Sequence, residues 1–326
     1  MKKIKVAIAG GAGYTAGELL RILLNHPLVE IGDILSESNA GNKVAEVHED
    51  LFYTDLQFTD NVADDHDILF VCRGHGASRA YLEAAGLPEK MKIIDLSQDF
   101  RHKENKSFAS RDFVYGLPEA KKKEISEADN IANPGCFATC IQLGLLPLAR
   151  ENMLQKPVQC TAITGSTGAG QKPSATGHFS WRNNNLSVYK PFQHQHLKEI
   201  EETLVFMGSN SAPKINFIPY RGNFTRGIIA SMYMEIEIDP DDAYQLYQEF
   251  FREHPFVKIS KENIHLKQVV NSNFGLIHLE KHDNQLLIIS AIDNLIKGAS
   301  GQAVQNMNLI FGFPETEGLK LKASYF

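Results

Sequence analysis

The stretch KIKVAIAGGAGYTAGELLRILLNHP (residues 3–27) decides the fold of the first part of the chain. It begins with a short apolar run, turns at several glycines and continues as a helix that ends at its proline. Glycines in such a turn let backbone N–H groups approach a diphosphate, which the positive helix N-terminus attracts. Gly10 and Gly13 fit this fingerprint, and its third position accepts the small Ala16. The stretch therefore predicts a dinucleotide-binding unit of strand, turn and helix.

Three further apolar runs continue the alternation of strand and helix over the first hundred residues. They are VEIGDILS (29–36), DILFVC (67–72) and KIIDLS (92–97). Short runs that are apolar on both faces are typical of parallel strands covered by helices. We therefore predict a doubly wound sheet with ligands at the carboxyl ends of its strands. Residues 103–129 are rich in Lys and Glu, and we expect them to form a solvated excursion.

The pattern changes after residue 155. GIIASMYMEIEID (227–239) alternates strictly, which predicts a strand that is buried on one face only. FGLIHLEKHDNQLLIISAID (274–293) is typical of a hairpin, and DPDDAYQLYQEFFREH (239–254) of a helix with an acidic start. The predicted fold class is α/β, with an N-terminal Rossmann-type dinucleotide-binding domain and an α+β catalytic domain that has a mixed or antiparallel sheet.

Composition limits the possible functions. With 326 residues the chain suits two domains, and its net charge of −6 gives no basic surface for nucleic acid or an anionic membrane. No apolar run approaches the ~20 residues that span a bilayer. The four cysteines lack the spacing of a zinc site or a disulfide framework. We expect a cytoplasmic protein that binds no metal, nucleic acid or membrane.

The stretch NIANPGCFATC (130–140) sets Cys136 directly after an Asn-Pro-Gly turn, at the start of an apolar helix. The free N–H groups and the positive helix end favour a thiolate at that position. We therefore predict that Cys136 is a nucleophile. The alternative, packing as a small hydrophobe, is the commoner role of a lone cysteine and is expected for Cys72, Cys140 and Cys160.

Candidate acid/base partners of Cys136 lie in FQHQHLKEIEETL (192–204), where two histidines stand at or just before a helix start. A neutral imidazole is favoured there, which suits a general base. A structural hydrogen-bonding role is the alternative for either His194 or His196. The segment LSESN (35–39) offers a ribose partner, because Ser36 and Ser38 suit a 2′-phosphate whereas Glu37 suits a free 2′-hydroxyl. We favour NADP.

Two other features suit ligands. The glycine-rich turn GSTGAG (165–170) follows a predicted strand and can present backbone N–H groups to an oxyanion or a nicotinamide amide. Arg226 and Arg101 stand where predicted strands begin or end, and an arginine fork matches phosphate or carboxylate geometry. Surface salt bridges are the alternative for both arginines.

Together these pieces resemble one family over nearly the whole chain, the N-acetyl-γ-glutamyl-phosphate reductases of arginine biosynthesis. The stretches that carry the resemblance are GGAGYTAGELL, IIDLSQDFR, YGLPEA, IANPGCFAT, GSTGAG, HQHLKEI, TRGI and IDNLIKGASGQAVQNMNLIFG. The resemblance implies NADPH, an acyl phosphate as substrate, a homodimer or homotetramer, and a C-terminal segment that returns to the first domain. The expected domains are residues 1–140 with 312–326 for NADP, and 141–311 for catalysis and oligomerisation.

The resemblance also implies roles for single residues. Cys136 matches the nucleophile, and Arg226 matches the arginine of the Arg-Gly-Ile segment. His194 matches the catalytic histidine, with the neighbouring His196 as the alternative for that role. Substrate contacts are expected from Arg226, Arg101, Arg221 and His196. Cofactor contacts are expected from Gly10, Gly11, Ala12, Gly13, Tyr14, Thr15, Ala16, Ser36, Ser38, Gly168 and Asn294.

Two segments depart from the family pattern. RGHG (73–76) has Gly74 where family members usually have proline, and PYRGNF (219–224) replaces a different segment before Arg226. The second change adds Arg221, which leads to the hypothesis that the substrate carries an extra carboxylate, as an N-succinyl group does.

Three alternatives remain open at the level of sequence. An aspartate-semialdehyde dehydrogenase shares the two-domain plan, and a substrate assay would separate it. A cysteine hydrolase or acyltransferase would leave the glycine-rich turn unexplained. A catalytically silent dinucleotide-binding regulator would leave Cys136 unexplained.

Overall fold

The computed structural model describes residues 3–74 and 76–326, which form two compact units. The first unit is the chain up to Pro134 with Ala299–Lys320, and the second is Gly135–Gly298 with Leu321–Phe326. The chain thus changes unit within the Asn-Pro-Gly turn, earlier than the expected residue 140. The chain returns to the first unit at Ala299, before helix α8 (Gly301–Ile310), and so earlier than the expected residue 312. Helix α8 belongs to the first unit because it packs on α1 (Tyr14–Leu23) and α3 (Pro118–Ser126).

The first unit contains a sheet of seven strands in the order β2-β1-β3-β4-β7-β6-β5, parallel except for the short β5–β6 pair. The strands are β1 (Ile4–Ala9), β2 (Val29–Leu35), β3 (Ile68–Val71), β4 (Lys92–Asp95), β5 (Ser107–Phe108), β6 (Arg111–Tyr115) and β7 (Asn130–Ala132). The other helices are α1 (Tyr14–Leu23), α2 (Ala77–Ala85) and α3 (Pro118–Ser126). The predicted parallel sheet is confirmed.

The expectation of a solvated excursion over residues 103–129 is wrong. Strand β6 pairs in parallel with β7, and the side chains of Phe113, Tyr115 and Leu117 are buried. Helix α3 follows and packs against α8. The apolar residues that enter the sheet are few and alternate over only five positions. Among the flanking Lys and Glu residues, so short an alternation does not stand out as a strand signal.

The second unit contains a mixed sheet of seven strands in the order β12-β13-β14-β11-β8-β10-β9. The strands are β8 (Val158–Thr164), β9 (Ser187–Val188), β10 (Ile215–Arg221), β11 (Ile228–Glu235), β12 (Val257–Ser260), β13 (Gly275–His282) and β14 (Gln285–Ile292). The helices are α4 (Cys136–Arg150), α5 (Phe179–Arg182), α6 (His196–Met207) and α7 (Pro240–Phe251). The predicted hairpin turns at Asp283, whose φ of 49° is left-handed.

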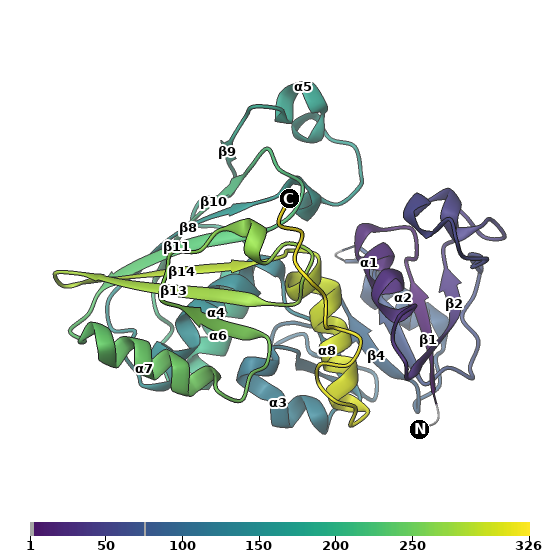
Figure 1. Ribbon diagram of the computed structural model, residues 1–326. Helices are drawn as coiled ribbons and strands as arrows, with labels where there is room; N and C mark the ends of the chain where they lie inside the picture. Colours follow the sequence, from purple (N-terminus) through teal and green to yellow (C-terminus); the bar gives the residue numbers. More distant parts are fainter. Residues whose placement is uncertain (1–2, 75) are drawn as a thin grey trace. The chain divides into compact units, whose positions relative to one another are not determined.

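Helices α4, α6 and α7 of the second unit cover one face of this sheet (Figure 1). Strand β11 alternates as predicted, since Met232 is buried whereas Ser231 and Tyr233 are exposed. Gly144 of α4 lies so close to Met232 that a Cβ at residue 144 would be 2.3 Å from its Cε. The segment between β8 and β9 carries α5 and extends away from the sheet (Figure 1). Among the described residues no helix is long and apolar enough to cross a bilayer.

We expect the two faces of β11 to differ in their contribution to stability. Met232→Ala removes a buried side chain that packs against α4, so it should lower the free energy of unfolding by about 2–5 kcal/mol. Ser231→Ala on the exposed face is the matched control and should change it by less than about 0.5 kcal/mol. Urea unfolding followed by circular dichroism measures both, and equal effects would contradict the one-sided burial.

Candidate active site

The glycine turn of the first unit has the geometry that a bound diphosphate needs. Gly10 has a left-handed φ of 86°, and a Cβ there would lie 2.8 Å from the carbonyl oxygen of Cys72. Gly13 is the N-cap of α1 and has an extended backbone with no side-chain cap. The first N–H groups of a helix have no acceptor within the helix, so those of Tyr14 and Thr15 can serve an anion. The predicted turn residues therefore fit a dinucleotide.

The segment after β2 presents two hydroxyl groups. Asn39 donates from Nδ2 to the Oγ atoms of Ser36 and Ser38, at 2.9 and 3.0 Å. A hydroxyl oxygen that accepts in this way keeps its own hydrogen for another acceptor. Both carboxylate oxygens of Glu37 accept from Nη2 of Arg73, at 2.9 and 3.0 Å. His75, in the RGHG stretch, lies outside the described residues.

In the second unit Cys136 is the first residue of α4, as predicted, with Gly135 as the N-cap. The first turn of α4 carries no acidic side chain and the N-cap has no side-chain hydrogen bond. Gly298 packs directly on the cysteine, since a Cβ at residue 298 would lie 2.9 Å from the Cys136 Cβ. The helix N-terminus therefore stabilises negative charge on the thiol of Cys136. The residue is half-buried, and its Cα and Cβ are tightly packed.

The two histidines of HQH occupy different environments. The ring of His196 lies against the Asn-Pro-Gly turn that precedes Cys136, since a Cβ at Gly135 would be 2.3 Å from its Nε2. Glu199, one turn further along α6, accepts a hydrogen bond from the Gly135 N–H at 3.1 Å, and its other oxygen is 3.8 Å from His196 Nε2. A glycine, an imidazole and a carboxylate thus meet beside Cys136.

His194 instead lies in an aromatic cluster. Its ring meets those of Phe137, Tyr189 and Phe217 edge-on, with centroids 5.4–5.8 Å apart. Its Nδ1 accepts a hydrogen bond from the His196 N–H at 3.2 Å. Burial, helped by the charge of Lys190, lowers the pKa of His194 to about 4. These contacts support His194 as a residue that positions His196, and its predicted catalytic role remains only a prediction.

Arg226 is held by a buried carboxylate that the sequence reasoning missed. Its Nε and Nη2 donate to Asp293 at 3.1 and 3.3 Å, and the Asp293 side chain has no exposed surface. Asp293 also accepts from the backbone N–H groups of Asn271, Leu295 and Ile296. The guanidinium at the predicted substrate position is therefore oriented by a fully hydrogen-bonded partner.

The glycine turn 165–170 is tied to the same region by Asn294. Its Oδ1 accepts from the Gly227 N–H at 2.7 Å and its Nδ2 donates to Thr167 Oγ1 at 3.0 Å. A Cβ at Gly168 would lie 3.2 Å from Thr164 Oγ1, so the turn is close-packed. The Asn294 amide thus positions this turn, and the predicted cofactor contacts of Asn294 and Gly168 remain untested.

The other predicted arginines differ in what they contact. Arg101 is only 6% exposed, and it donates to the carbonyl oxygens of Asn133 and Leu96 at 2.8 and 3.0 Å. These bonds support a role in holding the first unit's backbone. Arg221, at the end of β10, lies with its guanidinium carbon 4.8 Å from the centre of the Tyr189 ring.

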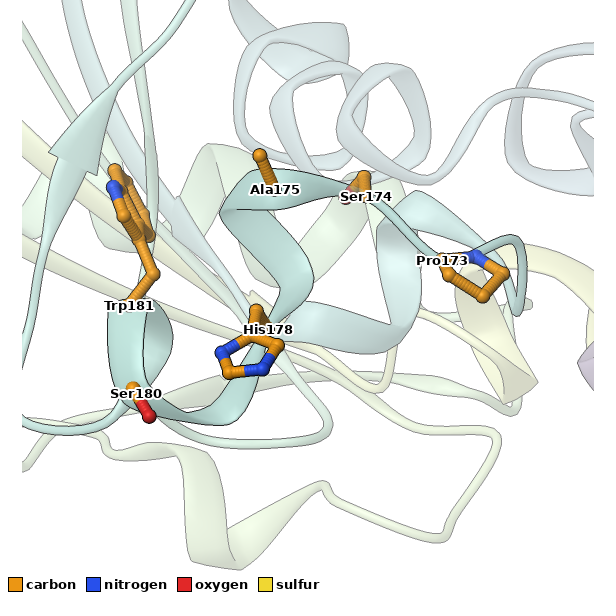
Figure 2. Close-up of a pocket in the computed structure, with 6 residues that line it drawn as sticks. All are labelled: Pro173, Ser174, Ala175, His178, Ser180 and Trp181. Atoms are coloured by element: carbon orange, nitrogen blue, oxygen red, sulfur yellow. The ribbon is translucent and has the colours of Figure 1, made fainter.

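An open hollow of about 610 Å³ lies in the segment that carries α5. Figure 2 shows that its lining side chains do not converge, since the Trp181 ring points upward in the view and the Ser180 side chain points downward. None of the predicted site residues lines it. We therefore assign it no part in the chemistry of Cys136.

Comparison with known proteins identifies the two units. Residues 5–128 match the family described as semialdehyde dehydrogenase, NAD binding domain, and residues 136–294 match its dimerisation domain. The N-acetyl-gamma-glutamyl-phosphate reductase of Phocaeicola vulgatus is 55% identical, over 99% of this chain and 100% of that protein. That of Parabacteroides distasonis is 56% identical, with the same coverage. The chain belongs to the N-acetyl-gamma-glutamyl-phosphate reductase family.

Solved structures agree with this assignment at the level of the fold. Aspartate semialdehyde dehydrogenase II from Vibrio cholerae, complexed with ASA, has a TM-score of 0.74 at 15% identity, over 96% of this chain and 99% of that one. Aspartate semialdehyde dehydrogenase with NADP from Candida albicans has a TM-score of 0.72 at 12% identity, over 95% and 99%. The predicted fold class is thereby confirmed, and the relatives at 55–56% identity confirm the predicted family. The chain is an oxidoreductase with a nicotinamide-dinucleotide-binding domain and a dimerisation domain.

Sequence reasoning missed Glu199 and Asp293, although this reductase chain contains a signal for each. Glu199 stands three residues after His196, which places the two side chains on one face of a helix. Asp293 directly precedes the predicted Asn294 at the end of a buried strand, where a carboxylate needs partners. Both residues act through backbone N–H groups, and no spacing rule identifies such contacts.

We expect His194 to make stability depend on pH. Its pKa is about 4 when folded, so between about pH 6.5 and 4 the unfolded chain binds a proton that the folded protein does not. The free energy of unfolding should therefore fall by about 2 kcal/mol more in the parent than in His194→Asn when the pH is lowered from 7 to 5. Asparagine keeps an acceptor near the His196 N–H and does not titrate.

Urea unfolding at several pH values between 7 and 5 measures this difference. His178→Asn, which makes the same substitution at an exposed histidine, is the matched control. A His194→Asn profile that is parallel to that of the parent would show that the buried imidazole does not titrate as described.

Proposed function

We propose that the chain reduces an N-acyl-γ-glutamyl phosphate with NADPH, which yields N-acyl-glutamate 5-semialdehyde and phosphate through a thioester on Cys136. The observation that carries this proposal is the position of Cys136 at the N-terminus of α4, beside the His196–Glu199 pair. The names of relatives that are 55% identical over 99% of this chain support the same substrate class.

The first step is the attack of the Cys136 thiolate on the acyl carbon. The C–S bond forms, the C–O bond to phosphate breaks, and phosphate leaves with the electron pair. The N-terminus of α4 stabilises the thiolate before attack. Backbone N–H groups in the first turn are suitable donors to the oxyanion that forms on the carbonyl.

When bound, NADPH supplies a hydride to the thioester carbonyl. The His196 imidazolium donates a proton to the developing alkoxide and accepts it again as the C–S bond breaks. The aldehyde leaves and Cys136 returns as a thiolate, which the helix end makes a good leaving group. Glu199 lies beside the His196 ring, and it accepts the hydrogen bond from the Gly135 N–H that keeps the turn in place.

Arg226 binds an anionic group of the substrate, because Asp293 fixes the plane of its guanidinium. The cofactor is held by the turn from Gly10 to Ala16 and by the hydroxyls of Ser36 and Ser38. The matched dimerisation domain supports a homodimer or homotetramer. Four free cysteines suit the cytoplasm, where thiols stay reduced.

Substitutions at the nucleophile and at the two histidines test this mechanism. Cys136→Ser should abolish turnover, and His196→Asn should lower kcat about 100-fold or more. His194→Asn should have a smaller effect, because that ring faces Phe137, Tyr189 and Phe217. The assay is phosphate-dependent oxidation of N-acyl-glutamate 5-semialdehyde, followed as NADPH formation.

Two outcomes would contradict the mechanism. Full activity in Cys136→Ser would exclude the thioester. A larger loss in His194→Asn than in His196→Asn would return the catalytic role to His194, in line with the expectation from sequence.

A second candidate substrate carries an N-succinyl group. Arg182 donates from Nη1 to the carbonyl oxygen of Arg221, at 2.8 Å, which brings two cationic residues together. Burial and the neighbouring Arg221 both lower the pKa of Arg182. Within the described part of the chain the Nε of Arg221 is buried and lacks a hydrogen-bond acceptor. Arg182 itself donates to the carbonyl oxygens of Thr176 and Arg221, so Arg221 is the residue that suits an additional carboxylate.

If Arg221 recognises that carboxylate, the enzyme should prefer N-succinyl- to N-acetyl-glutamyl phosphate in kcat/KM. Arg221→Ala should then reduce the preference roughly 10- to 100-fold by its effect on the succinyl substrate alone. An unchanged preference for the acetyl substrate in both proteins would exclude the idea.

A further inference from the structure

Arg73 reaches across the carboxyl end of β1 in the first unit. It follows β3, and its Nη2 contacts both oxygens of Glu37, which follows β2. Strand β1 lies between β2 and β3 in the sheet. The glycine turn packs on the backbone of the same residue, since a Cβ at Gly10 would lie 3.2 Å from Arg73 N. The backbone of Arg73 therefore borders the turn that suits a dinucleotide, and its guanidinium reaches the segment that follows β2.

The guanidinium is held in a defined orientation. Its central carbon lies 4.7 Å from the centre of the Tyr81 ring, a cation–π contact that fixes one face of the fork. The Arg73 side chain is 21% exposed and that of Glu37 is 67% exposed. An ion pair this exposed contributes little to folding, so its partners can separate at small cost.

Ser36 and Ser38 provide two more donors at the same strand end. Asn39 donates to both hydroxyl oxygens, so each hydroxyl hydrogen can reach a further acceptor. Two hydroxyls and one guanidinium suit a ligand with several anionic oxygens. Glu37 alone would suit a neutral ribose diol, but its charge is neutralised by Arg73.

We infer that Arg73 binds the 2′-phosphate of the adenosine in NADPH, and that Glu37 is its counter-ion in the free protein. On binding, the phosphate replaces Glu37 at the fork, with the hydroxyls of Ser36 and Ser38 as further donors. Arg73 thereby selects NADPH over NADH, because without it the Glu37 carboxylate would repel the phosphate. The inference rests on the proposed function only for the identity of the dinucleotide.

The test measures binding, not turnover. Quenching or enhancement of nicotinamide fluorescence gives the Kd of the full chain for NADPH and for NADH. Arg73→Met should weaken NADPH binding roughly 10- to 100-fold and change NADH binding less than about threefold. Glu37→Gln should leave NADPH binding unchanged or tighter, and weaken NADH binding. The ability of 2′,5′-ADP to compete with NADPH for the protein should be lost only in Arg73→Met.

Arg73→Lys is the matched control, since it keeps the charge but loses the fork and the stacking on Tyr81, and it should be intermediate. Equal weakening of NADPH and NADH binding in Arg73→Met, or no change in either, would overturn the inference. Either outcome leaves the Cys136 thioester untouched. If the proposed reaction fails instead, the ratio of the two Kd values still reports on Arg73.

Discussion

The absence of a side chain at Gly135 is the constraint on which the catalytic unit depends. The His196 ring occupies the space that a Cβ at this residue would fill, and Glu199 accepts from the same residue's N–H. One glycine thus joins the start of α4 to the start of α6. Any larger residue would separate the imidazole from the Asn-Pro-Gly turn, so Cys136, His196 and Glu199 are held together by a single backbone position.

Asp293 fixes the other side of the cysteine. It is fully buried, and its charge is matched by Arg226 and by three backbone N–H groups. A buried carboxylate is tolerated only when its oxygens are satisfied in this way. The Asp293 carbonyl also accepts from Gly298 N–H at 2.9 Å, and Gly298 packs on Cys136. The orientation of Arg226 and the packing of Cys136 therefore depend on the same residue.

Sequence patterns predicted the elements that carry strong local signals. The glycine turn after β1, the one-sided alternation of β11 and the start of α4 at Cys136 are as expected. Strand β6 was missed because its apolar residues are few and lie among charges. The HQH motif located two histidines but could not rank them, because their difference lies in contacts with Gly135 and Phe217, far away in the sequence.

The four thiols of this chain differ in ionisation. Burial raises the pKa of Cys72 and of Cys140 to about 12, and raises that of Cys160 well above its ordinary value. Cys140 lies one turn along the same helix as Cys136, yet it donates to a Ser290 oxygen inside the core. At neutral pH these three thiols are therefore protonated, and a reagent that needs a thiolate does not react with them. With Cys136 as the thiolate proposed above, the native protein can carry a single fluorophore, spin label or covalent inhibitor without removal of its other cysteines.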